Sequence, residues 1–128
     1  MNFYLPDYSV ITSNGFCRNV NRKSINDNPA RCQKIYVRQE SICKDFCTFL
    51  SWCVGYAYDF GNNNYCTLYA SNKDFKCPSG FTTYRNADVV ETANDLEAIY
   101  YNNYACYGKN SGEIGLRLQS FNFFAIIF

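Results

Sequence analysis

Eight cysteines are the residues of this chain whose type and number most directly suggest a chemical role. An even number of cysteines favours complete pairing in disulfides, which form in oxidising compartments. A structural zinc site is the alternative, but its ligands usually come in two closely spaced pairs, and only Cys43 and Cys47 have that spacing. We therefore expect the cysteines to form disulfides and to bind no metal. Their spacing does not choose among the roughly one hundred pairings that eight cysteines allow.

Histidine is absent from the sequence. Its absence excludes Ser-His-Asp and Cys-His sites, and it removes histidine as a general base. Carboxylates occur at Asp59 and within residues 88–97, but nothing in the sequence holds two of them at the separation that glycoside hydrolysis needs. The sequence also has no C-x-x-C redox motif and no recognised phosphate, dinucleotide or calcium loop. We therefore expect a protein that is not an enzyme and needs no cofactor.

Size and composition favour one small domain that works by binding. The chain has 128 residues, which suits a single domain. Its formal net charge is +1, so no overall field attracts nucleic acid or a membrane surface. Aromatic residues make up 19% of the chain, and such side chains dominate cores and interfaces.

Residues 41–50 predict a short helix that would position two of the cysteines. Cys43 and Cys47 are four residues apart, so they fall on one helical face together with Leu50, with Phe46 beside them. Ser41 is an acceptable N-cap at the start of this helix. A helix of about ten residues is marginal alone in water, so disulfides on its inner face would support it.

Residues 53–70 predict a hairpin of two alternating strands around a turn rich in glycine and asparagine. Cys53 and Cys66 share one face of this hairpin, and we expect that face to meet the helix. Gly55 and Ala57 lie on the same face, so we expect them to be small because the helix crosses above them.

The opposite face of the hairpin would then carry four tyrosines, which are Tyr56, Tyr58, Tyr65 and Tyr69. Such a face could stack on sugars or anchor a protein partner, because tyrosine is favoured at interfaces. The alternative is a second hydrophobic layer covered by the N-terminal segment or the tail, since large exposed apolar patches are rare in monomers.

A basic stretch precedes the helix. Residues 18–38 hold one acid, Asp27, and six basic residues, which are Arg18, Arg22, Lys23, Arg31, Lys34 and Arg38. Such a cluster could bind a sulfated polysaccharide, as basic clusters bind phosphates. The alternative is a solvated loop whose charge is partly balanced by the acidic residues of 88–97.

Alternating apolar residues predict the remaining strands. They cover residues 16–20, 33–38, 81–84 and 99–107, and residues 1–14 could add an edge strand. The tail ends in an apolar run that is far too short to span a membrane, which takes about 20 residues. We expect no membrane span in this chain.

One cysteine pattern resembles the PAN/apple family. It is Cys43-x3-Cys47-x5-Cys53, followed by VGYAYD, a polar turn and NYCTLY. In that family a cysteine-bearing helix precedes a strand with alternating aromatics and then a strand of the form C-x-L-aromatic. Cys17 and Cys106 also match in position, whereas Trp52 stands where the family often has glycine. The resemblance covers residues 14–108, with residues 1–13 as an N-terminal extension and 109–128 as a partly apolar tail.

The resemblance implies a fold and a disulfide pairing. The fold is α+β, a curved antiparallel sheet cradling one short helix and stapled by disulfides. The implied pairs are Cys17–Cys106, Cys43–Cys66 and Cys47–Cys53, which leaves Cys32 and Cys77 to pair with each other.

The resemblance also implies a function, since PAN/apple domains are non-catalytic modules that bind proteins or carbohydrates. We therefore expect an extracellular or secreted module with a protein or glycan ligand. The alternative is a structural or multimerisation unit of a larger secreted protein without its own ligand. The first 15 residues do not resemble a signal peptide, because they lack a basic start and Pro6 and Asp7 interrupt the apolar run. We therefore expect the chain to be a piece of a larger protein.

Overall fold

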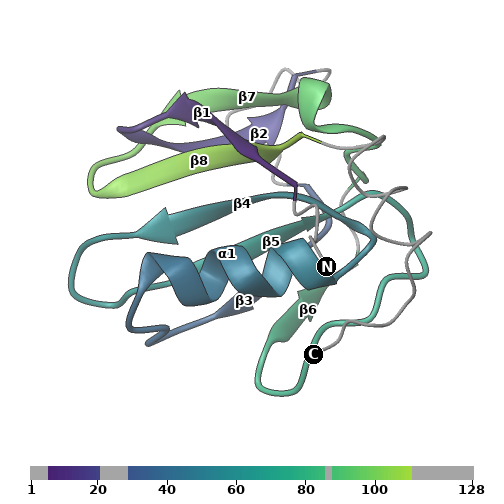
Figure 1. Cartoon of the computed structure of the whole chain (residues 1–128), viewed down its shortest axis with the longest axis horizontal. Coiled ribbons are helices and arrows are strands. Elements are labelled where there is room, and N and C mark those ends of the chain that lie inside the picture. Colours follow the sequence, from purple (N-terminus) through teal and green to yellow (C-terminus); the bar gives the residue numbers. More distant parts are fainter. Residues whose placement is uncertain (1–5, 21–28, 86–87, 111–128) are drawn as a thin grey trace, which may run out of the picture.

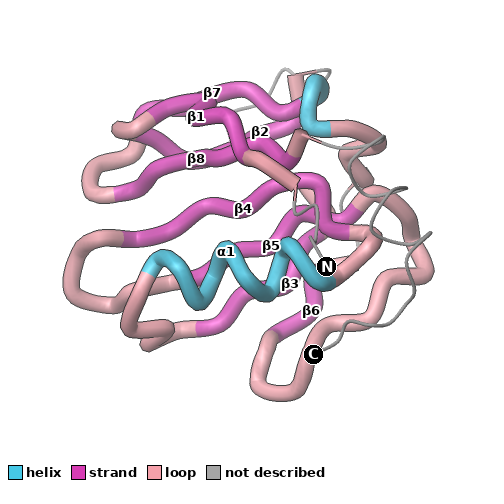
Figure 2. Tube along the Cα trace, in the orientation of Figure 1, coloured by secondary structure: helices cyan, strands magenta, loops and turns pink. Residues whose placement is uncertain are grey.

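The computed structural model describes residues 6–20, 29–85 and 88–110, which form two antiparallel sheets and one α-helix (Figures 1 and 2). The larger sheet contains, in spatial order, β1 (Tyr8–Thr12), β8 (Tyr104–Lys109), β4 (Cys53–Asp59), β5 (Cys66–Ala70), β3 (Arg31–Lys34) and β6 (Thr82–Tyr84). The smaller sheet pairs β2 (Gly15–Asn19) with β7 (Leu96–Tyr100), which follows a short 3-10 turn, Ala93–Asp95. The helix α1 spans Glu40–Phe49. The expected α+β architecture with one short helix is confirmed.

The larger sheet has a separate apolar core on each face, because successive residues of a strand point to opposite sides. On one face α1 buries Cys43 and Cys47 against Tyr56 and Leu68 (Figure 1). On the other face the β2–β7 sheet covers the residues of β4, β5 and β8 that point away from the helix. These residues and their cover form a second cluster of Cys17, Ala57, Tyr69, Val90, Leu96 and Cys106.

Four disulfides connect these layers, and they are the pairs that the resemblance implies. Two hold α1 to the sheet, Cys43–Cys66 to β5 and Cys47–Cys53 to the start of β4. Cys17–Cys106 joins the small sheet to β8, and Cys32–Cys77 joins β3 to the loop before β6. Four disulfides in one small domain are typical of proteins that fold in an oxidising compartment.

A β-bulge at the start of β4 decides which hairpin residues face the helix. The register with β5 shifts between Cys53 and Gly55, and beyond the bulge Tyr58 pairs with Cys66 on the helix side. Gly55 and Ala57 therefore lie on the face away from the helix, which corrects the expectation that the helix crosses above them. A Cβ on Gly55 would lie 2.6 Å from the backbone carbonyl oxygen of Tyr107 and 2.6 Å from Cδ1 of Leu96, so the backbone of β8, together with the β2–β7 sheet, requires glycine there.

Two predicted element boundaries are wrong at the start of α1. The strand expected over residues 33–38 ends at Lys34, because Tyr36 adopts a left-handed backbone with a φ of 64°. The helix begins at Glu40, and its N-cap is Gln39, which makes no side-chain capping bond. The Ser41 hydroxyl donates instead to the Gln39 side chain.

The predictions for the last strand and for the N-terminal segment have different outcomes. The single strand expected over residues 99–107 is two strands, β7 and β8, with a turn in which Asn103 has a φ of 70°. β1 pairs along β8 at the edge of the sheet, so the edge strand expected within residues 1–14 is confirmed. The tail from residue 111 lies outside the described residues. Among the described residues, no helix has the length and apolar character needed to cross a bilayer.

Candidate functional site

The four tyrosines expected on one exposed face are divided between the two layers. Tyr56 and Tyr58 are buried beneath α1, where Tyr56 donates to the Glu40 carboxylate. Tyr69 is buried on the opposite face, and Tyr65 is half-buried in the loop before β5. The prediction of a shared tyrosine surface is therefore wrong. Its physical cause is the bulge in β4, which reverses the direction of the residues that follow it.

The described basic residues do not gather on one surface either. Arg18 on β2 forms an ion pair with Glu97 on β7, with 2.6 Å between Nε and Oε2. Arg31 stacks its guanidinium over Tyr84 at 4.2 Å from the ring centroid. Lys34 is an odd number of residues from Arg31 on the same strand, so the two point to opposite faces. Arg38 is exposed in the loop before α1, and Arg22 and Lys23 lie outside the described residues.

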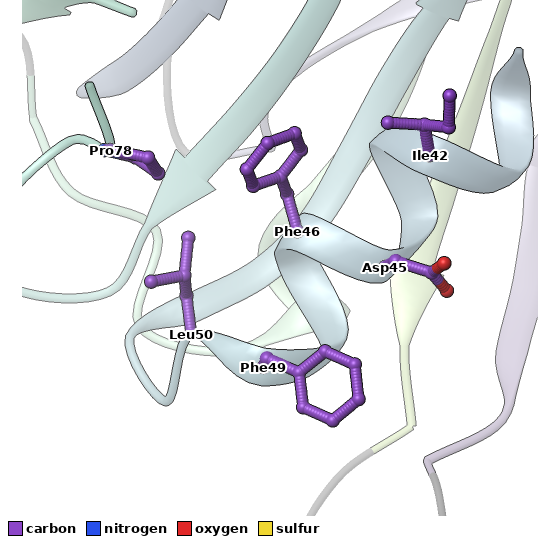
Figure 3. A pocket seen from close by; sticks show the side chains of 6 residues that line it. All are labelled: Ile42, Asp45, Phe46, Phe49, Leu50 and Pro78. Atoms are coloured by element: carbon purple, nitrogen blue, oxygen red, sulfur yellow. The ribbon is translucent and has the colours of Figure 1, made fainter. Parts of the chain in front are cut away.

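The outer face of α1 forms the candidate site, a shallow apolar groove of about 410 Å³ (Figure 3). Its apolar lining consists of Ile42, Phe46, Phe49 and Leu50, with Pro78 as the opposite wall. The helical residues recur at steps of four, three and one, which is the spacing of a stripe on one helical face. The inner face of the same helix carries Cys43 and Cys47, so α1 is apolar on both sides.

The lining residues differ in how far they are exposed, and the difference shows where a ligand would anchor. Phe49 is 72% exposed and Ile42 is 42% exposed, although both are large apolar side chains. Phe46 is half-buried because its ring packs edge-on against Phe81, with 5.0 Å between the ring centroids. Figure 3 shows Phe46 and Leu50 projecting on the side of Pro78, whereas the ring of Phe49 points away from Pro78. The groove thus has a fixed floor and an exposed aromatic end.

Disulfides hold both walls of this groove in place. The helical wall is tied to the sheet through Cys43 and Cys47, and Cys77, which precedes Pro78, is tied to Cys32 on β3. A surface that is fixed before binding loses less conformational entropy when a partner arrives. The groove is therefore a preorganised surface.

Asp45 is the one charged residue that lines the groove. Its side chain is exposed, and no basic side chain lies among the lining residues. A carboxylate beside an apolar stripe favours a partner that brings a positive charge together with apolar side chains. The groove thus combines an apolar stripe with one carboxylate, an arrangement suited to binding.

Hydrogen bonds from the sheet fix both ends of α1. Near the start Tyr56 contacts Glu40, and near the end the hydroxyl of Tyr8 lies 3.0 Å from that of Thr48. Lys109 of β8 places its ammonium against the helix C-terminus, where Nζ donates to the carbonyl of Cys47 at 2.7 Å. It also donates to the carbonyls of Thr48 and Leu50 at 3.5 and 3.2 Å. Burial lowers the pKa of Lys109 to about 8, so at neutral pH the group is still charged.

Replacing Lys109 by methionine should lower the free energy of unfolding by about 1–3 kcal/mol, because carbonyl groups at the helix end lose their donor. Chemical denaturation at pH 7 with the disulfides intact measures this loss. Lys76→Met is the matched control, since Lys76 is an exposed lysine in the loop before β6. An equal loss in both variants would show that the ammonium of Lys109 does not support the helix end.

The sequence contained a signal for this groove that the prediction of an inner cysteine face did not use. Ile42, Phe46 and Phe49 lie on a second apolar stripe of the same helix. A helix with two apolar stripes is either buried on both sides or exposes one to a partner.

In comparisons with known proteins, no family model, no curated protein and no solved structure matches the chain.

Proposed function

We propose that this chain is a non-catalytic recognition module of PAN/apple-like type, whose groove on α1 binds a segment of a partner protein. The exposure of Phe49 beside a preformed apolar groove is the observation that carries the proposal. Aromatic side chains of this kind act as anchors in protein interfaces. The four disulfides support both the family and an extracellular location, since they match the implied pairs and need an oxidising compartment.

The chemistry of the groove selects the partner. The apolar side chains favour a segment with bulky apolar residues, and Asp45 favours a lysine or arginine beside them. A second copy of this chain fits less well, because its own groove would bring another Asp45 and no basic lining residue. Desolvating a carboxylate without a counter-charge is unfavourable. A partner with an apolar and basic segment is therefore favoured over self-association.

Selection of random peptides displayed on phage, against the oxidised protein, tests this proposal. We expect the selected peptides to combine bulky apolar residues with at least one lysine or arginine. Phe49→Ser should weaken their binding about thirtyfold, which corresponds to roughly 2 kcal/mol for an anchor residue. Val10→Ser, which removes a 62% exposed apolar side chain on β1, should leave the affinity unchanged.

Two outcomes would contradict the proposal. If the selected peptides bind Phe49→Ser and the wild type with equal affinity, recognition takes place elsewhere on the protein. Dimers that form in analytical ultracentrifugation and dissociate on Phe49→Ser, without any peptide binding, would support a multimerisation unit instead.

A further inference from the structure

A second surface with ligand-binding chemistry lies at one end of the strands, where three loops meet. We call it the loop edge, and it consists of residues 35–39 between β3 and α1, 60–65 between β4 and β5, and 101–103 between β7 and β8. In Figure 1 these loops lie together on the left of the molecule. The surface shares no residue with the groove on α1, and it goes beyond the function proposed for that groove.

Backbone hydrogen bonds join the three loops to one another. The N–H of Tyr36 donates to the carbonyl of Asn63 at 2.9 Å, and Val37 donates to Asn64 at 3.0 Å. On the other side, the N–H of Phe60 donates to the carbonyl of Asn103 at 2.7 Å. The middle loop is thus bonded to both of its neighbours, and the loop edge is one continuous surface.

Each of the three loops presents one aromatic ring to solvent. Tyr36 is 64% exposed, Phe60 is 56% exposed and Tyr101 is 59% exposed. Internal contacts orient two of these rings, since Phe60 packs edge-on against Tyr58 and Tyr101 lies 5.1 Å from Tyr104 between centroids. More than half of the surface of each of these residues remains exposed.

The backbone of Tyr36 has the left-handed conformation, which glycine and asparagine adopt more readily than tyrosine does. Each loop contains one residue with positive φ, and in two of them it is an asparagine, Asn64 or Asn103. Asparagine tolerates this left-handed conformation, whereas an aromatic residue does so at a cost in free energy. A tyrosine kept there, with its ring exposed and not packed in the core, indicates that the ring serves a function outside folding.

The exposed polar side chains of the loop edge are mostly uncharged amides. Asn62, Asn63 and Asn102 are exposed in the same loops as the rings, and Arg38 is the one charged side chain in these three loops. An amide offers both donors and an acceptor, which suits neighbouring hydroxyl groups. The negative face of an aromatic ring attracts the slightly positive C–H face of a sugar ring. We infer that the loop edge is a binding site for neutral oligosaccharides.

An anionic polysaccharide fits this surface poorly, because such ligands need a cluster of positive charge. A protein partner also uses aromatic contacts, but its interface normally has an apolar core that excludes water. On the loop edge the three rings are interspersed with exposed amides instead. Neutral sugars are therefore the ligand class that the chemistry favours.

Binding of the oxidised protein to an array of neutral and sulfated oligosaccharides tests the inference. Titration of ¹⁵N-labelled protein with the neutral oligosaccharide that binds best then locates the site by NMR. We expect chemical-shift changes at the amides of residues 36, 60 and 101. Phe60→Ser and Tyr36→Asn should each weaken binding about tenfold, because each removes one stacking ring.

Tyr36→Asn separates binding from folding, since asparagine accepts the left-handed backbone. Its thermal unfolding midpoint should equal or exceed that of the wild type, while its affinity falls. Tyr84→Ser removes an exposed ring on β6, outside the loop edge, and should leave the affinity unchanged. Absence of neutral oligosaccharide binding, binding of sulfated sugars alone, or equal affinity of Tyr36→Asn and wild type would each overturn the inference. A protein ligand that causes the same shifts without any sugar binding would overturn it too.

Discussion

Replacing Cys17 and Cys106 together by alanine should lower the free energy of unfolding more than loss of any other disulfide. The bond joins residues 89 positions apart, and the chain-entropy relation gives about 4.6 kcal/mol for a loop of that length. It also connects the β2–β7 sheet to β8, so its loss frees the layer that covers Tyr69. Because small domains are stable by about 5–15 kcal/mol, this loss would remove a large share of the total.

Guanidinium denaturation of the double variant measures the effect, and Cys47→Ala with Cys53→Ala is the matched control. Those two cysteines are only 6 positions apart, so the same relation gives about 2 kcal/mol for their bond. In the variant that lacks Cys17 and Cys106, hydrogen exchange should also show β2 and β7 losing protection before β4 and β5. If both double variants lose the same stability, the small sheet is held by packing alone and this account of the layers is wrong.

A second large effect should appear at alkaline pH, where the protein is expected to lose stability steeply above pH 10.0. Burial raises the pKa of six tyrosines above 10.0, and that of Tyr8 reaches about 12. The others are Tyr56, Tyr58, Tyr69, Tyr104 and Tyr107. The unfolded chain releases these protons near pH 10 while the folded chain retains them. Their stabilising contribution is therefore complete below pH 10.0 and is lost as the pH rises through the folded pKa values.

Absorbance at 295 nm, followed together with far-UV circular dichroism, measures this transition. We expect the buried tyrosines to ionise only as the circular dichroism signal is lost, at a higher pH than in the unfolded chain. The reduced chain in denaturant serves as the control, and its tyrosines should ionise in one step near pH 10. A single step near pH 10 with the native circular dichroism signal intact would contradict the burial of these hydroxyl groups.

Local patterns in the sequence predicted the elements well where one residue type repeats at a fixed interval. The i, i+4 spacing of Cys43 and Cys47 predicted the helix and its inner face, and the structure has both. The alternation in residues 53–70 predicted a hairpin, and β4 and β5 form one within these bounds. The prediction failed at Tyr36, whose positive φ ends the strand early and which no local pattern marks.

The direction of the hairpin residues could not be predicted from alternation alone. Strict alternation placed Tyr56 and Tyr58 opposite Cys53, but one bulge residue in β4 puts all three on the helix side. A bulge depends on pairing with another strand, which is a long-range property. The predicted tyrosine surface was lost for this reason, and three exposed aromatic residues lie instead on the loop edge.

The sequence by itself determined that the chain is rich in disulfides and has a short helix followed by a hairpin, and it removed histidine-based catalysis. These conclusions follow from residue type and local spacing, which do not depend on how the layers pack. Only the tertiary structure decided which apolar side chains remain exposed. Phe49 and Phe60 look like core residues in the sequence, and they are exposed because no other described element covers them. Burial depends on contacts between distant segments, so the surfaces proposed for binding became visible only in the folded chain.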